Sequence, residues 1–371
     1  MGRFLIICLL LVSFSVRAQF EFFGHPERMD LAKRGGDFIY NLEEDSANLY
    51  IEKIREELPD HPVVPMMEGL QVLWLHIPVL DSVFETFLSK MNEVVRLSEG
   101  LPGGIKENDE ALFFALAARG LMAEYFADVG QYMRAVSEAK KAYSLVKRGF
   151  EKTDTINEFL FTSGLYNYFR VKYPEINPIY RPFVWLFKSG DKKLGLEQLH
   201  EATRNTIISR VEANIYIAYI YLRYEDTPEK AQEYLAYLID QYPNNNYLIT
   251  KYLESLRFEE YFKDVPLDLI LKLQQDDKPY ARMVGFIFHG LYVEKVLKHP
   301  EDALLYYGKG IDISRQLPNH GEFYKSLGYL GLGRITRKDK PGTSSAYLKK
   351  SLEYAETKDV KREARALLRQ E

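Results

Sequence analysis

The chain has little cysteine and, after its first residues, no long apolar run, and these absences exclude several kinds of protein. Among its 371 residues there is one cysteine, Cys8. Cys8 lies in an N-terminal segment that we expect to be cleaved, so the mature chain is predicted to have no disulfide, thiolate nucleophile or sulfur metal site. No later stretch approaches the ~20 apolar residues that a membrane-spanning helix needs. We therefore expect no transmembrane span.

The chain also lacks an excess of positive charge. Lysine and arginine number 49, aspartate and glutamate number 53, and the net charge is −4. No basic block interrupts this mildly acidic composition, whereas nucleic-acid binders concentrate basic residues on one face. We therefore expect no nucleic-acid partner.

The N-terminal segment 1–18 has the pattern of a secretory signal peptide. Arg3 precedes an apolar run that is strongest over residues 4–12, and Ala18 stands directly before a suitable cleavage point. Gln19 is then the first mature residue. The segment predicts export, to the periplasm or outer cell envelope of a Gram-negative bacterium.

One spacing of small and aliphatic residues occurs twice. A small residue is followed by aliphatic residues at +4 and +7 and by a proline at +12, in the sets Ala47, Ile51, Ile54, Pro59 and Ala231, Leu235, Leu238, Pro243. This spacing indicates a helix that buries one stripe and then stops. Its recurrence favours a stack of similar units over a single globule.

Further small residues are separated by 13 positions. The pairs are Ala218 and Ala231, Gly290 and Ala303, and Gly333 and Ala346, and a fourth unit contains Ala135, Ala139 and Ala142. Antiparallel helices approach to ~8–10 Å where bulky side chains are absent. We therefore expect these residues to lie at helix crossings.

On these residues the chain resembles the tetratricopeptide repeat family, and residues 164–199 are distantly similar to the inclusion-body clearance group of repeat proteins. The first resemblance implies a superhelix with a concave groove that binds peptides or proteins. The expected fold is an all-α superhelical solenoid of stacked antiparallel helix hairpins. Its expected divisions are the signal 1–18, N-terminal repeats 19–150, an elaborated repeat 151–205 and C-terminal repeats 206–371.

The segment 173–188 combines prolines with aromatic residues. Pro174, Pro178 and Pro182 are expected to end the helix predicted over 155–172. Three roles are open for the aromatic residues that follow, namely core packing, the wall of a binding groove, and contact with a membrane surface.

One helix, beginning near Arg210, suggests a binding site. Glu212, Tyr216, Tyr219 and Arg223 follow one another at intervals of four, three and four residues, so they share one face. Tyrosine and arginine often anchor protein interfaces. The four residues form either a strip that contacts a partner or an ordinary solvated helix surface.

No catalytic motif is present, and we expect no catalytic residues, cofactor or metal. The seven histidines are scattered, and Arg204 occupies the place of the second histidine in a zinc motif that would begin at His200. We expect a non-catalytic exported scaffold that binds a protein or peptide partner in the cell envelope. The alternative is a glycan or small-ligand binding module that uses exposed aromatic rings, and aromatic residues make up 14% of the chain.

Overall fold

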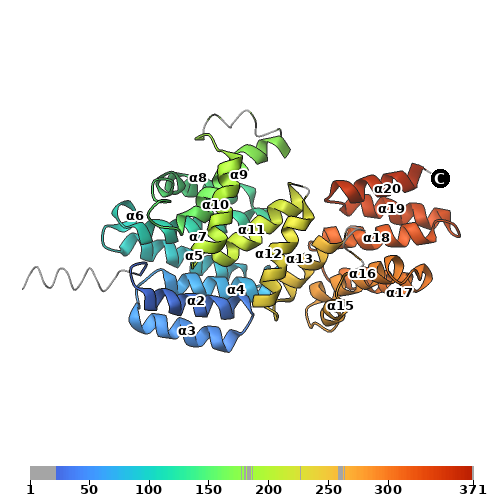
Figure 1. Ribbon diagram of the computed structural model, residues 1–371, viewed down its shortest axis with the longest axis horizontal. Helices are drawn as coiled ribbons and strands as arrows, with labels where there is room; N and C mark the ends of the chain where they lie inside the picture. Colours follow the sequence, from blue (N-terminus) through green and yellow to red (C-terminus); the bar gives the residue numbers. More distant parts are fainter. Residues whose placement is uncertain are drawn as a thin grey trace, which may run out of the picture. The chain divides into compact units, whose positions relative to one another are not determined.

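The computed structural model describes residues 22–369 except 177, 179, 180, 182–184, 186, 226, 258–261 and 263. The predicted signal 1–18 therefore lies outside the described residues, and export stays a prediction. The described chain is all-α, with eighteen helices and no strand (Figure 1). The expected all-α class is confirmed, and the helices pack against their neighbours in sequence as in a helical solenoid. The superhelical course of the solenoid stays a prediction.

The chain forms two compact units, which divide between Ile217 and Ala218 within helix α11 (Arg210–Arg223). The preceding helices of the N-terminal unit are α2 (Pro26–Tyr40), α3 (Glu44–Glu57), α4 (Val63–His76), α5 (Phe84–Gly100), α6 (Gly104–Glu107), α7 (Asp109–Asp128), α8 (Tyr132–Gly149), α9 (Phe159–Ile176) and α10 (Lys192–Asn205). The tightest pairs in this unit include α7 with α8 and α9 with α10. Both are helix hairpins of the expected kind.

The C-terminal unit continues the same pattern. Its further helices are α12 (Pro228–Gln241), α13 (Asn246–Leu256), α15 (Leu267–Gln274), α16 (Pro279–Lys295), α17 (Pro300–Ser314), α18 (Glu322–Thr336), α19 (Pro341–Tyr354) and α20 (Lys358–Arg369). Helices α16 to α20 follow one another as packed neighbours (Figure 1). Among the described helices of both units, none is long and apolar enough to cross a bilayer.

Most of the expected small residues do lie where helices meet. Ala231 and Ala303 are fully buried, and Ala218 is nearly so. At Gly290, an added Cβ would lie 2.7 Å from the ring of Tyr307 on α17. Because real Cβ atoms do not approach so closely, the tyrosine can pack here only against a glycine.

The prediction of a place at a helix crossing is wrong for two residues, Ala346 and Ala139. Ala346 on α19 is exposed, and Gly333 instead faces Leu348, whose Cγ would lie 2.7 Å from an added Cβ. The Ser344 hydroxyl donates a 2.7 Å hydrogen bond to the Gly333 carbonyl from the same face of α19. Ala139 on α8 is exposed as well. The spacing of 13 therefore finds the helix pair but does not fix which face of the second helix makes the contact.

Helix α9 runs past Pro174 to Ile176, so the expectation that this proline would end the helix is wrong. Pro174 costs α9 the hydrogen bond of its missing N–H, but only two residues follow it within the helix, so the loss is confined to the last turn. The aromatic residues that follow are partly outside the described residues. Of the others, Trp185 is 77% exposed, while Phe187 is half-buried against Tyr143.

Candidate functional site

The N-terminal unit contains an apolar cavity of about 400 Å³. Side chains from α2, α4, α7, α8, α9 and α11 line it, and most of them are aliphatic or aromatic. This volume lies within the range of small-molecule sites, ~300–1,000 Å³. Such a void has no internal packing to stabilise it, so it is a candidate binding site.

Small residues mark the place where the cavity opens. Gly120 on α7 and Ala139 on α8 both line it and are both exposed to solvent. A Cβ added at Gly120 would meet no atom within 4 Å. The lining of the cavity therefore reaches solvent at Gly120 and Ala139.

Two carboxyl groups from distant parts of the sequence face this apolar space. Glu124 lies on α7 and Glu212 on α11. The Tyr216 hydroxyl donates a hydrogen bond to Glu124 Oε2, and the Tyr40 hydroxyl donates one to Glu212 Oε1 at 3.0 Å. The Phe161 ring packs edge-on against Tyr216 with their centroids 5.5 Å apart. The carboxyls are thus held by hydroxyl donors within an aromatic wall.

Burial perturbs both carboxyl groups. Desolvation raises the pKa of Glu124 from 4.5 to about 7, against the effect of the hydrogen bond from Tyr216, and nearby Asp128 and Glu212 raise it further. Desolvation likewise raises the pKa of Glu212 from 4.5 to about 7, while the hydrogen bond from Tyr40 and the neighbouring indole of Trp74 oppose the rise. Strongly shifted groups in a concave apolar site are typical of functional sites.

Polar contacts at the N-terminal end of α11 hold this helix in the cavity wall. The Glu158 carboxylate accepts hydrogen bonds from the backbone N–H groups of Ile207, Ile208 and Ser209 at 2.6, 3.1 and 3.0 Å. An acidic group is favourable at this end of a helix, where N–H groups have no partner within the helix. An ion pair of 2.9 Å between Arg210 and Asp37 ties the same end to α2. Together these contacts position Glu212 and Tyr216.

The four residues of the expected contact strip do not share one environment. Glu212 and Tyr216 line the cavity of the N-terminal unit. Tyr219 and Arg223 belong to the C-terminal unit, where Tyr219 is 43% exposed with its ring 5.6 Å from that of Tyr224. Partner binding by the strip stays a prediction.

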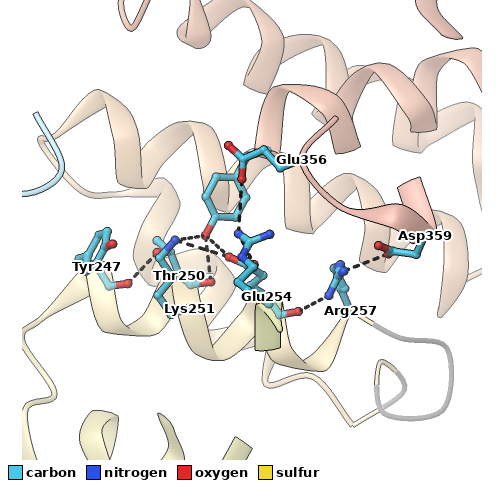
Figure 2. A network of polar contacts seen from close by, with 9 residues as sticks. Tyr247, Thr250, Lys251, Glu254, Arg257, Glu356 and Asp359 are labelled. Carbon is cyan, nitrogen blue, oxygen red and sulfur yellow. Dashed lines mark hydrogen bonds and ion pairs between the residues drawn. The ribbon is translucent and has the colours of Figure 1, made fainter. Parts of the chain in front are cut away.

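Arg223 takes part in a network of charged groups inside the C-terminal unit. Figure 2 shows this network and labels Lys251, Glu254, Arg257, Glu356 and Asp359 in it. Its Nη2 lies 2.6 Å from Glu254 Oε1 and 3.7 Å from Glu356 Oε2. The Tyr324 hydroxyl donates a 3.0 Å hydrogen bond to the other oxygen of Glu254, and Lys251 Nζ lies 3.5 Å from that oxygen. Glu254 is thus held from α11, α13 and α18 at once.

The network balances buried charge. Glu254 has no exposed surface, and desolvation favours its neutral form. Arg223, Lys251 and Arg257, with the hydrogen bond from Tyr324, nevertheless hold the pKa of Glu254 below its usual value. Arg257 also bonds Asp359 on α20 at 2.9 Å. Three basic side chains, Arg223, Lys251 and Arg257, therefore pair with three acidic ones, Glu254, Glu356 and Asp359, within this unit.

Sequence reasoning missed Glu124. It lies in the apolar stretch of α7 that reads LFFALAARGLMAEYF, and a single carboxyl in such a stretch is the signal that marks it. Among the described residues, no group of three or more His, Cys, Asp or Glu is arranged to hold a metal ion. Comparison of the chain with protein-family models and with characterised proteins finds no match.

Proposed function

We propose that the protein is a non-catalytic binding protein whose N-terminal unit receives an apolar ligand, or the apolar end of a larger one, in the cavity. The observation that carries this proposal is an accessible void of about 400 Å³ with a predominantly apolar lining. Filling it with an apolar group removes that group from water and restores dispersion contacts that the lining lacks.

Small-ligand binding by this route differs from glycan binding on exposed rings. Sugars stack on exposed aromatic faces, but Tyr168 is fully buried and Tyr166 and Tyr216 are half-buried in the cavity region. Exposed rings occur in both units, and none of them lines the cavity: Tyr132, Tyr173 and Trp185 in the N-terminal unit and Tyr219 and Tyr237 in the C-terminal unit. The aromatic residues therefore support an enclosed apolar site better than a sugar platform.

Titration with Nile red, a neutral dye that fluoresces in apolar surroundings, tests the proposal. We expect the protein to enhance its emission and Gly120→Leu to weaken binding roughly tenfold or more, because the new side chain occupies the opening. Gly308→Leu on α17 is the matched control, since a Cβ there also meets no atom within 4 Å. Equal affinity in all three proteins would show that the dye binds elsewhere and would reject the cavity as the site.

A protein or peptide partner is the second candidate, and the start of α8 supports it. Tyr132 is 69% exposed, Met133 is 82% exposed, and Val136 is also exposed one turn later. Contiguous exposed apolar patches are typical of protein interaction sites. A Met133→Lys, Val136→Lys variant should lose a partner that the parent protein captures from cell-envelope extract. Unchanged capture would exclude this surface.

A further inference from the structure

The ionisable acidic and basic side chains that line the cavity are all acidic. Its lining contains Glu124 and Glu212 but no lysine, arginine or histidine. Within the described chain, neither glutamate forms an ion pair, and the hydrogen bonds they accept come from uncharged groups. Buried charges in proteins are normally paired with an opposite charge.

Two basic residues on the lining helices α8 and α9, Lys147 and Arg170, have other partners. Lys147 lies over the ring of Tyr143, with its Nζ 5.1 Å from the centroid. Arg170 interacts with Tyr166 and donates to the Phe187 carbonyl at 3.4 Å. The groups that do act on the two glutamates are Tyr40, Trp74, Tyr216 and a third carboxyl group, Asp128, while Glu212 itself acts on Glu124. A cation is therefore absent from the described side chains that surround the carboxyls.

We propose that the cavity binds an amphiphile whose apolar body fills the void and whose protonated amine lies between Glu124 and Glu212. This proposal rests on the proposed function and names its ligand class. A desolvated ammonium–carboxylate contact forms charge-assisted hydrogen bonds, which are about twice as strong as neutral ones. The rings of Tyr216, Phe161 and Tyr40 add aromatic faces, which attract cations.

Three probes with the same eight-carbon chain test the amine. Octylamine, 1-octanol and octanoate are titrated by calorimetry into the full chain at pH 8, where both glutamates are largely ionised. We expect octylamine to bind at least roughly tenfold more tightly than 1-octanol, as one charge-assisted hydrogen bond provides. Octanoate should bind most weakly, because its carboxylate meets two others.

The double variant Glu124→Gln, Glu212→Gln provides the matched control. It keeps the size and hydrogen-bonding capacity of the wall, so 1-octanol should bind as before while the preference for octylamine disappears. Loss of both ligands, with the circular dichroism unchanged, would show that the glutamates shape the cavity and would overturn their role in selecting the amine.

The outcomes separate the two proposals. If 1-octanol and octylamine bind with equal affinity, the cavity is a binding site and the amine inference is wrong. If neither binds, and Nile red binding does not respond to Gly120→Leu, the proposed function itself fails. Tighter binding of octanoate than of octylamine would reverse the inferred charge of the ligand.

Proton release gives an independent readout. At pH 6.5 the carboxyls are mostly protonated, since the pKa of each is about 7. An ammonium group favours their ionised form, so octylamine should release protons, detected as a binding heat that varies with the ionisation enthalpy of the buffer. 1-Octanol should release none. Equal proton release by both ligands would contradict a direct ammonium–carboxylate contact.

Discussion

Replacing Glu212 by glutamine is expected to stabilise the N-terminal unit at neutral and alkaline pH but not in acid. The pKa of Glu212 is about 7 in the folded chain and 4.5 as the ordinary value, because its carboxylate is desolvated. Folding therefore favours the protonated side chain. The stability that Glu212 contributes is fully present below pH 4.5 and is lost as the pH rises through 7.

The size of this effect follows from the shift. One pKa unit corresponds to ~1.4 kcal/mol, so a rise from 4.5 to about 7 makes the ionised side chain cost about 3 kcal/mol above pH 7. Glutamine does not ionise, and its carbonyl still accepts the hydrogen bond of Tyr40. The variant should gain about 3 kcal/mol over the parent protein between pH 4.5 and pH 8.

Tryptophan fluorescence during urea denaturation measures the effect in the correct unit. Both tryptophans of the chain, Trp74 and Trp185, precede Ile217, and Trp74 lies beside Glu212. The exposed Glu56 on α3 provides a control, since Glu56→Gln should change the stability little at any pH. A difference between Glu212→Gln and the parent protein that stays constant from pH 4.5 to 8 would refute the desolvation of this carboxyl.

Two further predictions concern the C-terminal unit. Charge reversal in Arg223→Glu should destabilise this unit by ~3–5 kcal/mol, because Glu254 has no exposed surface and would lose its closest cation; a thermal transition within a degree of the parent protein would contradict the network in Figure 2. Ala231→Trp should lower the melting temperature, since overpacking a fully buried site costs ~1–3 kcal/mol or more. Ala346→Trp should be tolerated because Ala346 is exposed, and equal losses in the two variants would argue against these placements.

Local sequence patterns located several of the described helices. The predicted buried stripes lie on α3 (Ala47, Ile51, Ile54) and α12 (Ala231, Leu235, Leu238), and the helix predicted to begin near Arg210 is α11. Local signals set these limits, such as Pro228, Pro279, Pro300 and Pro341 in the first turns of their helices. Such signals act within a few residues, so one sequence displays them fully.

The face of a helix at a crossing was harder to predict. Ala346 and Ser344 are both small and lie two positions apart on α19, but only Ser344 is buried and bonded to Gly333. The choice between them depends on the rotation of α19 against α18, which many side chains along both helices decide together. Spacing between two small residues contains no information on that rotation.

The sequence by itself determined an all-α chain of successive helix pairs, because hydrophobic period, small residues and prolines act locally. Only the tertiary structure brought Glu124 to the same cavity as Glu212, 88 positions later, and separated Glu212 from Arg223 although they share one helix. The physical reason is that a void is a deficit of packing among side chains from six helices. The identity of a single residue does not reveal such a void. The pKa values of the two carboxyls are raised only when the folded chain surrounds them with apolar side chains.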